Sequence, residues 1–215
     1  MDVAYDESNH RASSRNGTSR VALELDHTPQ TTNPTIFSDD LMLSWTPVIL
    51  IRDPVLVYES WLRAEGEPYP SLESPYAKIY TTLRFQRAIL DWYQSRTTEC
   101  RQYVIVLDAD DVIENHSVME KLCDLIGMDK RRLLYEWEAS TIPAKFQTNE
   151  RFKRFMRTIS DSTCVDWGKV SDGICLEDKE LAWEGEFGSE RAAALASRVR
   201  ESWLDYQYLK SMRLL

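Results

Sequence analysis

The sequence predicts an α/β protein in which helices flank a parallel sheet and the C-terminal third is helical. Two short runs, residues 47–51 and 103–107, are continuously apolar and rich in β-branched side chains. Runs of this kind, with no polar residue on either face, are typical of strands buried inside a parallel sheet. Apolar residues at helical spacing follow each run, so we expect two strand–helix units joined by a long helix.

The composition limits the classes of partner. The chain has 215 residues, 43% of them hydrophobic, and a formal net charge of -9. Its length and apolar content suit one domain with a real core. We expect a polar, partly disordered arm over residues 1–35 and a single domain over residues 36–215. Nucleic acids and anionic membranes attract positively charged proteins, so neither is an expected partner of this acidic chain.

The first strand leads directly into a helix. Arg52, Asp53 and Pro54 follow the apolar run 47–51. Aspartate is a favoured N-cap residue, and proline suits the first helical position. We therefore expect a tight turn and then a helix. Its apolar positions would be Val55, Leu56, Tyr58, Trp61 and Leu62.

Further elements follow from periodicity and helix-stop signals. A long helix is expected from residue 76 to residue 96, and a second from 117 to 126 with Gly127 as its C-cap. Residues 150–159 and 189–212 are expected to be helical as well. The long helix would bury Ile79, Leu83, Ala88, Leu90 and Trp92. The second would bury Val118, Leu122, Leu125 and Ile126.

Arg52 and Ser60 form the clearest candidate site. Arg52 follows a parallel strand, at the edge of the sheet where open α/β proteins bind their ligands. Ser60 comes eight residues later, about two helical turns onward. A guanidinium and a hydroxyl so placed could hold one phosphate group. The alternative is that Arg52 pairs with a nearby acid while Ser60 faces solvent.

Asp108, Asp110 and Asp111 follow the second strand. Such acids could bind Mg²⁺, or they could cap helices and position the loop, and we favour the second role. No GxxxxGK[ST] phosphate loop is present, which argues against a nucleotide hydrolase. No metal is expected, because the three histidines show no ligand spacing. Four scattered cysteines without a CxxC pair indicate reduced thiols in a cytoplasmic protein: Cys100, Cys123, Cys164 and Cys175.

Residues 47–61, PVILIRDPVLVYESW, resemble the strand–turn–helix that carries the donor's 3′-phosphate site in sulfotransferases. The segment YVIVLDADDVIENHSVMEKLCDLIGMD resembles a later strand, acidic turn and helix of that family. The chain is similar to a fungal branch of these P-loop-fold proteins, which is associated with secondary-metabolite gene clusters. NPTIFSDDLMLSW, LRFQRAILDWYQ and DYQYLKSMRL carry this similarity, which spans residues 33–215.

The resemblance implies a sulfotransferase-like α/β fold and transfer of a sulfonyl group to a small-molecule hydroxyl. The donor would be 3′-phosphoadenosine 5′-phosphosulfate (PAPS). It also implies that Arg52 and Ser60 contact the 3′-phosphate, and it makes Lys169 the nearest candidate for a later basic contact. The segment VALELDHTP resembles a shortened form of the strand that delivers the catalytic histidine, which would make His27 the base.

The chain departs from the family before Asn33. A complete member has a longer N-terminal segment, with a loop that grips the donor's phosphosulfate, so we expect this chain to be truncated and to lack that loop. Two alternatives therefore stay open. The chain could be a catalytically degenerate accessory or binding protein, with a protein partner or as a homo-oligomer. It could also be a tailoring enzyme that transforms a metabolite without the donor.

Overall fold

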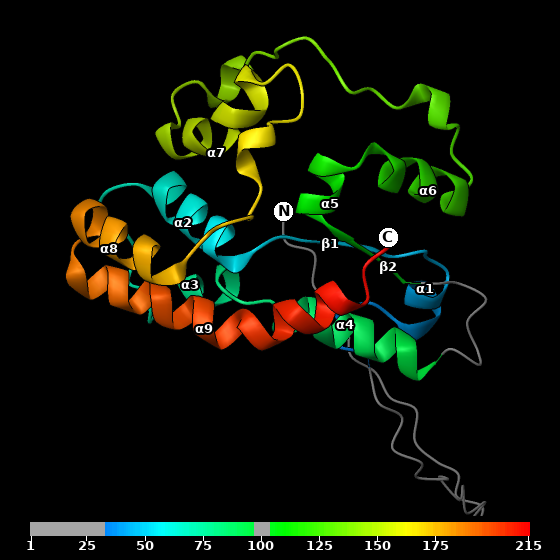
Figure 1. Cartoon of the computed structure of the whole chain (residues 1–215), viewed down its shortest axis with the longest axis horizontal. Coiled ribbons are helices and arrows are strands. Elements are labelled where there is room, and N and C mark those ends of the chain that lie inside the picture. Colours follow the sequence, from blue (N-terminus) through cyan, green and yellow to red (C-terminus); the bar gives the residue numbers. More distant parts are fainter. Residues whose placement is uncertain (1–32, 97–103) are drawn as a thin grey trace, which may run out of the picture. The chain divides into compact units, whose positions relative to one another are not determined.

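The computed structural model of the chain describes residues 33–96 and 104–215 (Figure 1). Within these ranges the protein is α/β, with mostly helices and a two-stranded parallel sheet. Strand β1 (Val48–Ile51) pairs with β2 (Ile105–Asp108) so that Ile51 lies opposite Asp108. The outer edge of β2 is bordered by the C-terminal residues, since the Leu214 N–H donates to the Val106 carbonyl over 2.8 Å. The expected division between an arm and a domain stays a prediction, because almost all of residues 1–35 lie outside the described ranges.

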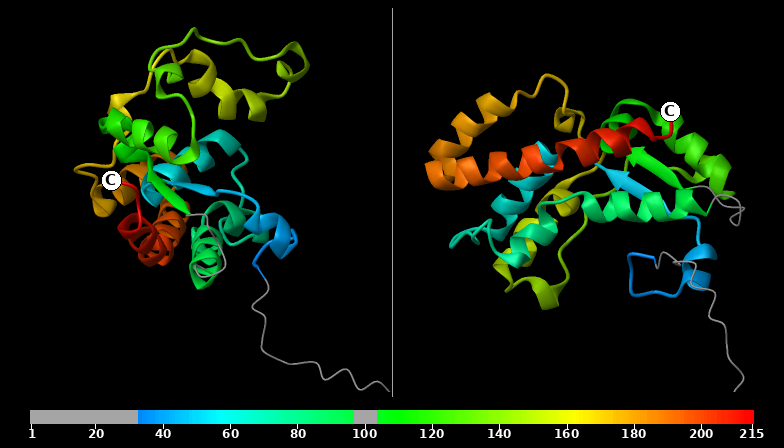
Figure 2. Two further views of the ribbon diagram at one scale, coloured as in Figure 1. Left: turned by 90° about the vertical axis from the view of Figure 1, so that its right-hand side faces the viewer. Right: turned by 90° about the horizontal axis from the view of Figure 1, so that it is seen from below.

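Helices cover the two faces of the sheet unequally (Figures 1 and 2). Helices α4 (Arg84–Ser95) and α9 (Ser189–Ser211) pack on one face. Helix α6 (His116–Ile126) packs on the other face, against β2. The first cluster contains Ile49, Ile51, Leu83, Leu90, Val106, Tyr206 and Leu209. The second contains Ile105, Leu107, Val118 and Leu122.

This coverage corrects the prediction for residues 47–51. Strand β2 is buried on both faces, as predicted, but β1 is buried only at alternate positions. Val48 and Leu50 are 43% and 61% exposed. The side chains of a strand alternate between faces, and among residues 33–96 and 104–215 helices pack only against the face that carries Ile49 and Ile51.

A second core lies among helices. Helix α2 (Pro54–Glu65) packs with α9 and with α8 (Leu176–Phe187) around buried aromatic and aliphatic side chains. The carboxylate of Glu59, on α2, is buried in this core. It accepts hydrogen bonds from the Lys179 ammonium at 3.0 Å and from the Trp183 indole N–H at 2.9 Å. These bonds tie α2 to α8, so polar and apolar contacts act together there.

The single helix expected over residues 76–96 is wrong. The structure has α3 (Pro75–Tyr80) and then α4, with a break between them. Both the backbone N–H and the hydroxyl of Thr81 bond the Ala77 carbonyl, at 2.9 Å each, and end α3. Threonine hydroxyls compete in this way with continued helical bonding. The break leaves Ile79 59% exposed, whereas it was expected to be buried.

The remaining helices are α1 (Asp39–Leu43), α5 (Ala109–Glu114), α7 (Glu150–Asp161) and three 3₁₀ turns. The turns are η1 (Lys130–Arg132), η2 (Ala144–Phe146) and η3 (Trp167–Lys169). The expected helices at 117–126, 150–159 and 189–212 are present with shifted ends, and neither α5 nor α8 was expected. Leu125 is 53% exposed rather than buried. Within the described part of the chain, no helix is both long and apolar enough to cross a membrane.

Candidate functional site

The turn after β1 forms as the sequence predicts. The Asp53 carboxylate accepts the Val55 backbone N–H at 2.8 Å and caps α2, which begins at Pro54. Because Ile51 lies opposite Asp108, both strands end at the same edge of the sheet. Ligands of open α/β sheets bind at this kind of edge, so the residues that follow β1 and β2 define the candidate site.

Arg52 connects this edge to a distant loop. Its Nη2 donates to the Lys169 carbonyl over 2.7 Å, across 117 positions in the sequence. Its Nε is buried and has no hydrogen-bond partner among the described residues. A buried donor without an acceptor is costly, and an anionic ligand oxygen is one group that could satisfy it. The Lys169 ammonium lies 3.4 Å from Asp166 and is 38% exposed, so it can turn toward a ligand.

The structure does not connect Ser60, another predicted site residue, to Arg52. Ser60 is exposed on α2 and shares no hydrogen bond with Arg52 in the part of the chain that the structure describes. His27 lies outside the described residues. The contact of Arg52 with the Lys169 loop is therefore the part of the predicted phosphate site that the structure brings together.

The three acids after β2 have partners within the protein. Asp108 is fully buried, caps α5 through the Asp110 N–H, and lies 3.1 Å from the Lys210 ammonium. Asp110 accepts from the backbone N–H and the hydroxyl of Ser171. Asp111 pairs with the Arg213 guanidinium at 2.7 Å. This is the capping and loop-positioning role favoured above. Among the described residues, no group of three or more His, Cys, Asp or Glu side chains is placed to hold a metal ion.

Burial and close charges shift the pKa values at this edge. Burial raises the pKa of Asp53, and the carboxylates of Asp110 and Asp108 raise it further. Burial also raises the pKa of Tyr206 above its usual range, and its hydroxyl donates to Asp108 over 3.1 Å. Burial disfavours the charged form of Lys210, but the bonds to Tyr206 and Asp108 outweigh it and raise its pKa. Lys210 therefore stays charged, and the Asp53 carboxylate accepts a proton more readily than an ordinary aspartate does.

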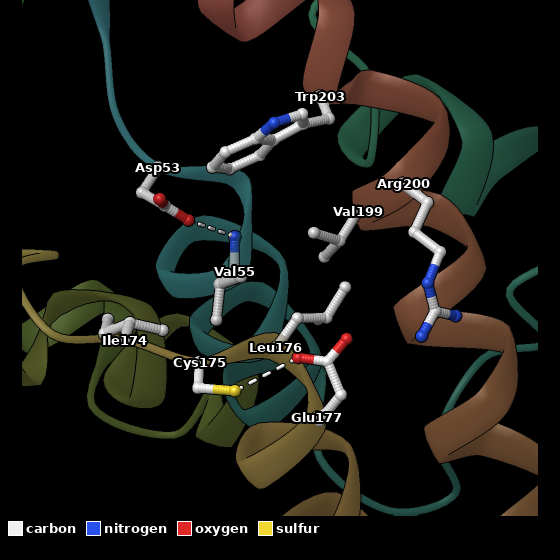
Figure 3. A pocket seen from close by; sticks show the side chains of 9 residues that line it. All are labelled: Asp53, Val55, Ile174, Cys175, Leu176, Glu177, Val199, Arg200 and Trp203. Atoms are coloured by element: carbon white, nitrogen blue, oxygen red, sulfur yellow. Dashed lines mark hydrogen bonds between the residues drawn. The ribbon is translucent and has the colours of Figure 1, made fainter.

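Two hollows open beside these residues. The first, of about 560 Å³, carries five carboxylate side chains against the two basic groups Lys210 and Arg213. The second, of about 570 Å³, is lined by four aliphatic side chains, one indole ring, one thiol and three charged side chains (Figure 3). Asp53, Ile174 and Trp203 line both, so the hollows adjoin through these three residues. The carboxylates of the first are Asp53, Asp110, Asp111, Glu114 and Asp172.

Sequence analysis missed part of this site. Trp203, Tyr206 and Lys210 were given no role there. The three residues are spaced by three and then four positions, which is the spacing of side chains on one helix face. A polar residue that continues an aromatic face is the signal that could have found Lys210.

Comparison with curated proteins finds two fungal relatives. The chain is 33% identical to a protein named Sulfotransferase ppzF from Metarhizium majus (strain ARSEF 297), over 195 residues. It is 30% identical to a protein of the same name from Metarhizium rileyi (strain RCEF 4871), over 193 residues. Each alignment covers 85% of this chain and 56% of the relative, so the chain spans about half the length of the curated relatives it matches. No family model matches the chain, and no solved structure matches it significantly. The chain is therefore similar to part of two proteins named Sulfotransferase.

Proposed function

We propose that the chain is a cytoplasmic sulfotransferase-like protein that transfers a sulfonyl group from PAPS to a hydroxyl group of a small metabolite. The setting we propose is fungal secondary metabolism, within a P-loop type of α/β fold. Two relatives named Sulfotransferase, each aligned over 85% of the chain, support the reaction class. The parallel strands, with their polar residues gathered at one edge, are compatible with it.

The observation that carries the proposal is the environment of Arg52. One guanidinium nitrogen holds the Lys169 carbonyl, and the buried Nε has no acceptor among the described residues. We assign this group to the 3′-phosphate of the donor, because charge-assisted bonds from arginine to phosphate are strong and directional. The exposed hydroxyl of Ser60 and the ammonium of Lys169 would add contacts from α2 and from the loop.

The proposed reaction is a transfer at sulfur. The acceptor oxygen forms a bond to sulfur while the bond between sulfur and the donor's 5′-phosphate oxygen breaks. Adenosine 3′,5′-bisphosphate (PAP) leaves with the electron pair, and the hydroxyl proton passes to a base. Our candidate for the base is His27, which lies outside the described residues.

Calorimetric titration with PAP tests the Arg52 assignment. Arg52→Ala should weaken binding by about 2–3 kcal/mol, roughly 30- to 150-fold, on the scale of hydrogen bonds to charged groups. The matched control is Arg131→Ala, which removes an arginine side chain that is 87% exposed and should leave binding unchanged. Equal PAP affinity in Arg52→Ala and the wild type would contradict the assignment.

A second candidate function is favoured by the charge of the first hollow. Its five carboxylates face two basic groups, so it repels a polyanion such as a phosphosulfate. A catalytically degenerate accessory protein, or a tailoring enzyme that does not use the donor, would not need positive charge there. Incubation of the whole chain with PAPS and a panel of phenols and alcohols separates the candidates. Release of PAP that depends on the acceptor supports transfer, and its absence in a protein that binds PAP supports the second candidate.

A further inference from the structure

The second hollow has the dimensions of a small-molecule site. It lies between the first turn of α2, residues 174–177 and the middle of α9 (Figure 3). Its volume of about 570 Å³ falls within the range typical of ligand pockets, roughly 300–1,000 Å³. Val55 and Val199 form part of its lining and belong to the buried core between α2, α8 and α9. That part of the wall therefore rests on close-packed residues.

Trp203 forms one wall of the hollow. Its indole is 39% exposed, although its neighbour on the same helix face, Tyr206, is only 2% exposed. The two rings lie 5.6 Å apart at an interplanar angle of 49°, so Tyr206 supports the indole from one side. A large aromatic side chain at the mouth of an apolar hollow offers its face to a second ring, which would pack against it in an offset or edge-on arrangement.

Asp53 supplies an acceptor beside this wall. Asp53 lines the hollow together with Trp203, and Figure 3 shows its carboxylate bonded to the Val55 N–H. Asp53 is only 6% exposed, and one of its oxygens accepts the Val55 N–H. The other oxygen receives no hydrogen bond from any residue within 33–96 or 104–215. A carboxylate oxygen that lines a hollow and receives no hydrogen bond from the protein is well placed to accept one from a ligand.

The opposite end of the hollow does not attract anions. Glu177 lies there with Arg200, and the Arg200 guanidinium is already paired with Glu180 at 2.9 Å. The Cys175 thiol donates to the Glu177 carboxylate over 3.0 Å, and this bond holds the pKa of Glu177 below its usual value. Glu177 therefore stays charged. With carboxylates at both ends and aliphatic groups between them, the lining suits a neutral ligand.

We propose that this hollow binds the acceptor, a flat, mainly apolar and uncharged molecule that carries a hydroxyl group. Its ring would pack against Trp203 and the valines, and its hydroxyl would donate to Asp53. Only the description of this ligand as an acceptor rests on the proposed function, because the binding itself requires no donor. A ligand seated in this way would present its oxygen at the edge of the sheet where β1 ends.

Ligand-observed NMR titration of the whole chain tests the proposal, with 2-naphthol as the probe. The comparison compound is its methyl ether, 2-methoxynaphthalene, which has no hydroxyl group to donate a hydrogen bond. The wild type should bind 2-naphthol about tenfold more tightly than the methyl ether. Trp203→Ala should weaken 2-naphthol binding about tenfold. The matched control is Trp137→Ala, because Trp137 is similarly exposed, at 38%, and does not line the hollow. This control should bind as the wild type does.

A second variant separates the hydrogen bond from the packing. Asp53→Asn retains a side-chain oxygen for the helix cap and turns an amide donor toward the hollow. It should remove the preference for 2-naphthol over its methyl ether while keeping the fold. No binding of 2-naphthol by the wild type, or equal binding by Trp203→Ala and Trp137→Ala, would overturn the proposal. PAP titration of the same samples reports on the proposed donor site, so failure of one assignment can be told from failure of the other.

Discussion

Glu59 offers a quantitative test of how the helical core is held. The substitution Glu59→Gln preserves the shape of the side chain and removes its charge. Glu59 is 5% exposed and lies 3.0 Å from Lys179, 3.3 Å from Arg63 and 2.9 Å from the Trp183 indole nitrogen. Hydrogen bonds to a charged group contribute about 1.5–3 kcal/mol, and breaking a fully buried ion pair costs about 3–5 kcal/mol.

The expected cost falls in the lower of these two ranges. Lys179 and Arg63 are 29% and 46% exposed, so both can regain water when the carboxylate is neutralised. We expect Glu59→Gln to lower the free energy of unfolding by about 2–3 kcal/mol, which for a chain of this size lowers the Tm by about 4–12 °C. Urea denaturation followed by circular dichroism measures the change. Glu186→Gln is the control, because this 38%-exposed carboxylate shares Arg63 and should cost less than about 1 kcal/mol.

The pH dependence of this stability difference has a predictable direction. Burial raises the pKa of Glu59, but the bonds from Trp183 and Lys179 and the charge of Arg63 together lower it below the usual value of 4.5. A lowered carboxyl pKa in the folded state stabilises the fold above the unfolded-state pKa, and this contribution is lost as the pH falls through the folded-state value. The difference between wild type and Glu59→Gln should therefore shrink on acidification below the usual glutamate pKa. Equal costs for Glu59→Gln and Glu186→Gln, or a difference that grows in acid, would refute this account of the core.

Two further substitutions test the turn at each end of α2. Asp53→Asn keeps the cap on Val55 and removes a charge whose pKa burial raises, so the variant should equal or exceed the wild type in stability at mildly alkaline pH. That advantage over the wild type should fade as the pH falls, because the wild-type fold is favoured when the Asp53 carboxyl group, with its raised pKa, becomes protonated. An Asp53→Asn variant clearly less stable than the wild type at alkaline pH would contradict this prediction. Gly66→Ala should cost at least about 1 kcal/mol more than Gly127→Ala in denaturant unfolding. Both glycines have positive φ, near +71° and +73°, so the backbone strain is similar. At Gly66, however, the new Cβ would lie 2.6 Å from the Arg154 guanidinium, which bonds the last carbonyls of α2. Equal costs for the two substitutions would count against this capping role of Arg154.

The local elements of the fold were predictable where a few neighbouring residues decide them. Asp53 and Pro54 specify the start of α2 through the cap and the fixed proline φ. Gly127 ends α6 in the left-handed conformation, with φ of +73°. The break at Thr81 was missed because the apolar spacing continues across it, and only the bonds of Thr81 to Ala77 reveal the end of α3.

Long-range placement was not predictable from the pattern. The apolar run that forms β1 predicts burial of both faces, but Leu50 is 61% exposed because the helices of the described part of the chain cover only one face of that strand. The spacing of Arg52 and Ser60 predicts a shared ligand. The structure instead connects Arg52 to the carbonyl of Lys169, and which loop crosses the end of a strand depends on the whole chain path. The same reason explains why Lys210 was missed, since its contact with Asp108 forms only once α9 crosses the sheet.

The central claim is that Arg52 recognises a 3′-phosphate, and a pair of nucleotides tests it most directly. PAP and adenosine 5′-monophosphate differ only in that group. Calorimetry on the whole chain should show PAP binding at least about tenfold more tightly, a difference of about 1.4 kcal/mol. Arg52→Ala should reduce the difference to nearly nothing, because the strong donor to the 3′-phosphate is gone. Equal affinity of the wild type for the two nucleotides, or a preference that survives in Arg52→Ala, would contradict the claim.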